Sequence, residues 1–212
     1  LGAKGSDLPD VPQNAIDKES VLAVTKFLVD GCQQAIELFG SENLILENNL
    51  QSLGYLKAAS TLPKVVKTVL DETGCGFLFD LSHARLAAEE LGMNLQEYMD
   101  ALPLDRIHEM HITGIQLMDD TWRGKIQRYA PGEYFSNHFY GHKFDHLPFV
   151  EEDWKVTKWA FDQIKTGNWK KPEIIALEFG GVGGGFFSAT TDVEVYKEQI
   201  PRLYEMVEGL NA

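Results

Sequence analysis

The sequence is poor in cysteine, in long apolar runs and in positive charge. Its 212 residues hold two cysteines, Cys32 and Cys75, too few and wrongly spaced for a disulfide framework or a zinc ribbon. No run approaches the roughly 18 apolar residues of a membrane-spanning helix. With 19 basic against 32 acidic residues the net charge is −13, which opposes binding to nucleic acid or an anionic membrane. We therefore expect a soluble cytoplasmic protein whose partners are small molecules, metal ions or another protein.

Hydrophobic residues, by contrast, are plentiful. They make up 44% of the chain, enough for one substantial core, and we expect a single domain over residues 1–212. The chain begins with Leu1 in a Gly, Pro and Asp-rich stretch, residues 1–13, that is typical of a loop. We expect that earlier strands of the same fold precede this stretch.

Helical and strand patterns alternate along the chain. Apolar residues at helical spacing predict helices over residues 17–39, 62–72, 83–91, 94–101, 151–165 and 192–209. Short apolar runs predict strands over residues 44–47, 75–81, 106–112 and 174–178. Strands that alternate with helices indicate a parallel sheet with right-handed crossovers. The expected fold is α/β, of the TIM (β/α)8 barrel type, of which this chain holds the C-terminal four βα units.

Two segments fall outside this alternation. Residues 113–146 are rich in aromatic side chains without clear periodicity, and loops this long are usually functional lids. No apolar run supports a strand near Asp145, so we predict one elaborated loop whose aromatic residues either pack in the core or roof a pocket. Residues 180–185 are glycine-rich but lack the signatures of a phosphate or dinucleotide site, which predicts a simple turn.

All four predicted strands end in a side chain that can bind a metal or transfer a proton. These residues are Glu47, Asp80, His111 and Glu178. A lone acidic residue at a strand end is more often a helix N-cap or a solvated loop residue. Four such strands favour a shared site, because the chemistry of α/β barrels gathers where the strands end. We therefore expect these four residues to converge on one point.

Further ligands lie near these strand ends. His83 follows Asp80 by a short turn, and Asp145 and His146 lie in the long loop. His108 precedes His111 by three residues, so strand alternation points it to the opposite face, and we predict a structural role for it. Carboxylate and imidazole ligands together suit divalent iron, manganese or zinc. The predicted metal ligands are Glu47, Asp80, His83, His111, Asp145, His146 and Glu178, with Glu47 and Glu178 also as candidate catalytic groups.

Three segments of the sequence form a recognisable set: Leu46-Glu47-Asn48, the run TGCGFLFDLSHA over residues 73–84, and Leu102-Pro103 followed by IHEMHITG over residues 107–114. Together they resemble the DUF692 family of multinuclear non-haem iron-dependent oxidases. The family lies within the xylose-isomerase-like TIM-barrel superfamily. The resemblance implies a barrel that holds several iron ions and uses dioxygen to rework cysteine or nearby residues of a peptide, often presented by a partner protein.

The resemblance also implies roles for individual residues. It places Glu47, Asp80, His83, His111 and Glu178 at metal-binding positions of the superfamily. Many oxidase members have Asn where this chain has His83, a departure that favours the broader superfamily. The later Asp/His motif of the family is matched loosely by Asp145-His146-Leu147-Pro148.

Three functions follow from these observations. The first is a metal-dependent oxidase that modifies a peptide, with iron as the metal. The second is a metal-dependent isomerase or epimerase of a sugar-like substrate, in which Glu47 or Glu178 moves the proton. The third is a non-catalytic protein, either a degenerate barrel or a half-barrel, that binds a partner or forms an oligomer through its exposed sheet edges. A DNA phosphodiesterase of the same superfamily is disfavoured by the charge of −13.

Overall fold

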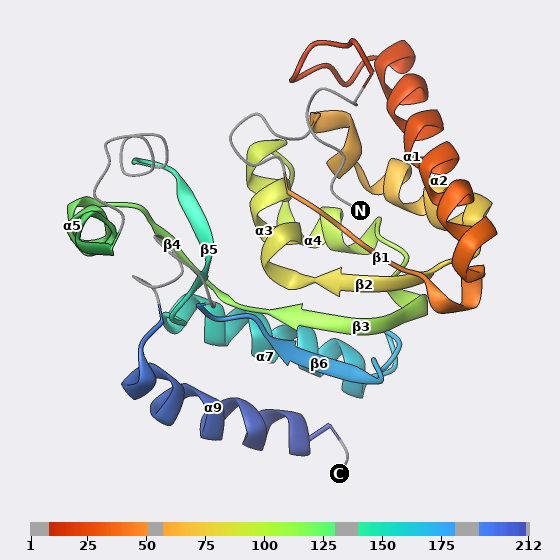
Figure 1. The fold of residues 1–212 in the computed structure, drawn as a ribbon. Coiled ribbons are helices and arrows are strands. Elements are labelled where there is room, and N and C mark those ends of the chain that lie inside the picture. Colours follow the sequence, from red (N-terminus) through yellow and green to blue (C-terminus); the bar gives the residue numbers. More distant parts are fainter. Residues whose placement is uncertain (1–8, 51–56, 130–139, 181–190, 211–212) are drawn as a thin grey trace. The chain divides into compact units, whose positions relative to one another are not determined.

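A computed structural model describes residues 9–50, 57–129, 140–180 and 191–210 (Figure 1). The chain forms two compact units. The first comprises Leu1–Met110 with Pro172–Ile174, and the second His111–Lys171 with Ile175–Ala212. No helix among the described residues is long and apolar enough to cross a membrane.

The first unit begins with two helices that share an apolar core. Helix α1 (Lys18–Phe39) starts at Asp17, whose carboxylate accepts hydrogen bonds from the backbone N–H groups of Glu19 and Ser20. Helix α2 (Pro63–Thr73) ends at Gly74, which adopts a left-handed conformation with φ of 69°. The two helices, together with Ala59 from the segment before α2, share a core of the buried residues Val21, Val24, Ala59, Val65 and Val69. Hydrophobic burial thus fixes this helix pair (Figure 1).

The described residues of the first unit also form two paired parallel strands and two further helices. Strand β1 (Ile45–Glu47) pairs with β2 (Gly76–Asp80) so that Glu47 lies opposite Leu78. Helix α3 (Leu81–Glu90) follows β2 directly, and α4 (Leu95–Asp100) comes next. Short 3₁₀ helices cover Ser41–Asn43, Ala58–Thr61 and Leu104–Arg106. The direct passage from β2 into α3 places the end of the strand beside the first turn of the helix.

Four described strands form one sheet in the order β1-β2-β3-β6. Strands β3 (Ile107–Ile112) and β6 (Ile174–Leu177) each begin in the first unit and end in the second. The backbone N–H of Glu173 donates to the carbonyl of His108, and that of Glu178 donates to the carbonyl of Ile112. Both strands advance in the same direction between these two hydrogen bonds, so β3 and β6 are parallel.

The described part of the second unit contains an antiparallel strand pair and three helices. Strands β4 (Gly114–Leu117) and β5 (Lys143–Leu147) pair with a bulge between Gly114 and Gln116. A Cβ atom at Gly114 would collide with the carbonyl oxygen of Pro148, so only glycine fits this close approach. The helices are α5 (Asp120–Tyr129), α7 (Glu151–Lys165) and α9 (Val193–Glu208). The Gln199 side chain ties α9 to the backbone of Phe149 through two hydrogen bonds.

The structure confirms the α/β class, the mostly parallel sheet, and the predicted helices and main strands to within two residues at each end. The prediction of one loop over residues 113–146 is wrong, because β4, α5 and β5 lie there. Strand β5 has no continuous apolar run, since Asp145 occupies one of its buried positions. Most of the predicted turn at residues 180–185, and part of the aromatic stretch, lie outside the described residues.

Candidate metal centre

Three predicted ligands gather in the first unit where β1 and β2 end. Nδ1 of His83 lies 3.1 Å from Oε1 of Glu47, and Nε2 of His83 lies 3.9 Å from Oδ2 of Asp80. The Asp80 side chain is completely buried and that of Glu47 is 35% exposed. Glu47, Asp80 and His83 form the first-unit group, which combines a buried carboxylate, a carboxylate that reaches solvent, and an imidazole.

Asp80 is both a helix N-cap and a candidate ligand. Its Oδ1 accepts a hydrogen bond of 2.7 Å from the backbone N–H of His83 and so begins helix α3. Its Oδ2 is the oxygen that faces the His83 imidazole. Because capping uses one oxygen and the imidazole faces the other, the structural role of Asp80 does not exclude metal binding.

Asn48, for which the sequence predicts no role, links the first-unit group through hydrogen bonds. Its Nδ2 donates to the carbonyl of Asp80 at 2.9 Å, and its Oδ1 accepts from the Asp80 N–H at 2.8 Å. The Asn48 carbonyl lies 2.9 Å from Nδ1 of His83. Asn48 directly follows Glu47 at the end of an apolar run, and this position was the signal in the sequence that could have pointed to it.

Four predicted ligands lie in the second unit. Nδ1 of His111 lies 3.2 Å from Oε1 of Glu178, and Nε2 of His146 lies 3.8 Å from Oε2 of the same carboxylate. The backbone hydrogen bond from Glu178 to Ile112 sets this register, because it holds the end of β6 beside the end of β3. The second-unit group consists of these three residues and Asp145, and Glu178 bridges its two histidines.

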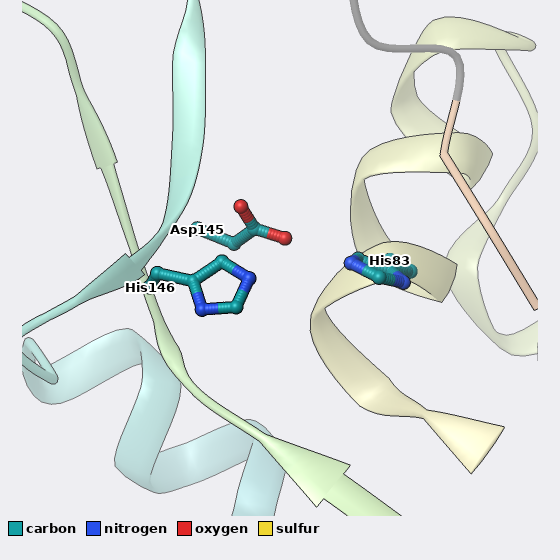
Figure 2. A group of neighbouring side chains, drawn as sticks. All are labelled: His83, Asp145 and His146. Carbon is teal, nitrogen blue, oxygen red and sulfur yellow. The ribbon is translucent and has the colours of Figure 1, made fainter. Parts of the chain in front are cut away.

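Asp145 and His146 reach the same side of β5 although they are neighbours in sequence. Successive side chains of a strand normally point to opposite faces. His146 has a φ of 57°, the only positive value at a non-glycine position among the described residues, and this breaks the alternation. Figure 2 shows both side chains pointing away from the strand on one side, and their ligating atoms approach within 4.8 Å. A left-handed histidine at a cluster of ligating groups is the kind of strain found at functional sites.

His108 has different surroundings from His111, although both lie on β3. Its Nδ1 lies 3.5 Å from the exposed carboxylate of Glu173, and its side chain is 45% exposed. His108 therefore belongs to neither group of predicted ligands.

The residues present fit a divalent transition metal. The first-unit group offers two carboxylates and one imidazole, and the second-unit group offers two of each. Mixed carboxylate and imidazole donors suit iron, manganese and zinc. Asp80 and Asp145 are buried polar side chains, and burial of a carboxylate is costly unless a partner or a metal stabilises it. The charge and burial of these groups favour a cation as their natural ligand.

A comparison with protein families shows the family to which the chain belongs. The family model described as "RiPP precursor modification enzyme MbnB/TglH/ChrH", which is of the DUF692 type, matches residues 8–130, more than half of the chain. The chain belongs to this family. The family is one of metal-dependent enzymes that modify precursors of ribosomally synthesised peptides. The matched segment contains the first-unit group and His111, whereas Asp145, His146 and Glu178 lie beyond it.

Curated relatives agree with the family assignment. A UPF0276 protein of Acaryochloris marina is 30% identical over 114 residues, which is 54% of this chain and 38% of the relative. One from Paraburkholderia phytofirmans is 30% identical over 71 residues, 34% of this chain and 23% of the relative. One from Caulobacter vibrioides is 28% identical over 116 residues, 53% of this chain and 38% of the relative. These matches thus span between 23% and 38% of the relatives' length.

Proposed function

We propose that this protein is a metal-dependent oxidase that modifies a peptide, with iron as its metal. The observation that carries the proposal is the family match over residues 8–130, which contains Glu47, Asp80, His83 and His111. A family match alone would give a weak inference, because function depends on the site rather than the fold. Here the ligand types that the chemistry requires are present at the strand ends.

The proposed ligands are the members of the first-unit and second-unit groups. They come from the ends of β1, β2, β3 and β6, from the first turn of α3, and from β5. We assign them to one site because the strand ends of a parallel α/β fold supply the residues of its active site. Iron, when bound, would supply the redox chemistry with dioxygen. The prediction that these ligands converge on one centre is part of the proposal.

The exposure of the carboxylates divides their proposed tasks. Asp80 and Asp145 are buried, so they hold a cation and cannot readily exchange protons with solvent. Glu47 and Glu178 are 35% and 32% exposed and each lies near an imidazole, so they are the groups that can move a proton to or from a substrate. His83 and His111 orient these carboxylates.

The proposed fold is a TIM barrel in which further strands continue the four-stranded sheet. Strands β1 and β6 are the outer strands of the sheet among the described residues. Each exposes a large apolar residue, Ile45 at 45% and Ile174 at 54%. Exposed apolar edge strands are prone to aggregation, and closure into a barrel removes the edges. Additional strands that pair with β1 and β6 would cover both isoleucines.

The proposed substrate is a peptide, as the description of the family states for its members. A partner protein that presents the peptide is part of this proposal. The test is oxygen uptake by the iron-loaded protein with a cysteine-containing precursor peptide, followed by mass spectrometry of the peptide. We expect oxygen consumption with a mass change in the peptide. Purification with stoichiometric zinc or manganese, and no oxygen uptake with iron, would contradict an oxidase.

The isomerase alternative retains one specific observation in its favour. Glu47 and Glu178 are partly exposed carboxylates beside imidazoles, an arrangement that also suits proton transfer on a sugar. Incorporation of solvent deuterium into a sugar by the metal-loaded protein, without oxygen uptake, would favour this alternative over the oxidase.

A further inference from the structure

Asn48 links two candidate ligands, Asp80 and His83, through long-range hydrogen bonds. Its side chain makes a reciprocal pair of hydrogen bonds with the backbone of Asp80, donating to the carbonyl and accepting from the N–H. The Asn48 residue is 1% exposed, so water does not readily replace these bonds. The pair fixes the backbone after β1 against the last residue of β2.

This fixed backbone points the Asn48 carbonyl at one nitrogen of His83. The distance from the carbonyl oxygen to Nδ1 is 2.9 Å, and Oε1 of Glu47 lies 3.1 Å from the same nitrogen. A carbonyl oxygen and an ionised carboxylate only accept hydrogen bonds, so Nδ1 must carry the proton if it bonds to either of them. In a neutral imidazole Nε2 then carries the lone pair.

Nε2 of His83 is directed at Asp80. Its distance of 3.9 Å from Oδ2 is longer than a hydrogen bond but is suitable for two ligands of one ion. Metal-binding histidines commonly donate their other ring N–H to a backbone carbonyl or a carboxylate, and this contact sets the tautomer and the ring orientation. The contacts of Nδ1 match that arrangement.

We propose that Asn48 is a positioning residue that holds His83 as the Nδ1–H tautomer and thereby makes Nε2 its metal-binding atom. The second half of this statement rests on the proposed function, whereas the tautomer can be measured without any metal. Asn48 acts through the backbone that it anchors and touches no reacting atom.

The test is long-range proton–nitrogen NMR of metal-free protein labelled with ¹⁵N-histidine. The spectra are recorded at about pH 8.5, above the ordinary histidine pKa of about 6.5. We expect His83 as the Nδ1–H tautomer in the wild-type protein and a larger share of the Nε2–H tautomer in Asn48→Ala. Asn43→Ala is the matched control, because Asn43 is exposed and its side chain bonds to the carbonyl of Phe39. It should leave the His83 signals unchanged.

A titration with Fe²⁺ without oxygen separates this proposal from the proposed function. Asn48→Ala should bind Fe²⁺ about 10–100-fold more weakly, as is typical when a partner of a ligand is lost. Asn48→Asp keeps the acceptor for the Asp80 N–H and should fall between alanine and the wild type. Wild-type protein that binds Fe²⁺ while His83 is the Nε2–H tautomer would overturn the positioning role. The Nδ1–H tautomer in a wild-type protein that binds no metal would instead refute the proposed function.

Discussion

Replacement of Asp80 by asparagine should separate metal binding from helix capping. Asparagine and aspartate are about equally good N-caps, so the introduced amide oxygen can still accept the 2.7 Å hydrogen bond from the backbone N–H of His83. Asp80→Asn should therefore change the unfolding free energy of the metal-free protein by a few tenths of a kcal/mol at most. Asp80→Ala loses the cap and should cost about 1 kcal/mol, with a range of about 0.5–2 kcal/mol.

Metal affinity should respond in a different order. Both variants lack the buried carboxylate, so both should bind Fe²⁺ more weakly than the wild type. The loss should exceed the roughly 10–100-fold that is typical when a residue hydrogen-bonded to a metal ligand is removed. Urea unfolding of the metal-free protein and anaerobic Fe²⁺ titration measure the two quantities. Asp17→Asn is the matched control, because Asp17 caps α1 in the same way but lies outside both groups of ligands. Wild-type affinity in Asp80→Asn would refute Asp80 as a ligand, and a loss of stability equal to that of Asp80→Ala would refute the capping argument.

Two further predictions concern the fold. Gly114→Ala should destabilise the protein by about 1–3 kcal/mol in urea, because its Cβ would meet backbone atoms of Pro148. At Gly124 in α5 an added Cβ would meet no atom within 4 Å outside its own stretch of helix, so Gly124→Ala should instead raise the unfolding free energy by about 0.5–1 kcal/mol. A change of the same sign in both variants would contradict this difference in packing. Burial raises the pKa of Tyr98. Unfolded tyrosine ionises near pH 10 and folded Tyr98 stays neutral, so stability should fall above about pH 10. Tyr98→Phe should reduce this loss of stability. The same dependence of the unfolding free energy on pH in Tyr98→Phe and in the wild type would contradict the role of Tyr98.

The parallel strands could be predicted from the sequence because their signals are local. The run Gly76–Asp80 includes Phe77 and Phe79, both fully buried, and it reads as a continuous apolar strand. The start of α1 and the end of α2 could also be predicted, since Asp17 and Gly74 are ordinary start and stop signals of helices.

The antiparallel pair β4 and β5 could not be predicted in this way. Strand β5 holds the buried residues Asp145 and Leu147, so a carboxylate takes a position where the pattern would require an apolar residue. Its pairing with β4 depends on the close approach at Gly114, which only the folded backbone reveals. A strand that carries a charged side chain in a buried position loses the pattern by which strands are recognised.

The sequence predicts which residue types form the candidate site, but it does not predict the hydrogen bonds that hold them. Glu47, Asp80 and His83 were readable from the strand ends, whereas the role of Asn48 depends on hydrogen bonds over 32 and 35 positions. The positive φ of His146 could not be predicted from the sequence either, although it explains how Asp145 and His146 point to one side. Spacing along the chain predicts which residues meet, but backbone geometry decides which atoms face each other.

Metal analysis of the purified protein tests the central claim most directly. Two variants of β3 form the comparison, His111→Ala, which removes a proposed ligand beside Glu178, and His108→Ala, which removes an exposed histidine beside Glu173. After anaerobic loading with Fe²⁺ and removal of excess metal, elemental analysis should find stoichiometric iron in the wild type and in His108→Ala, and a clear loss in His111→Ala. Equal iron content in both variants, or no retained metal in the wild type, would contradict a metal centre at these strand ends.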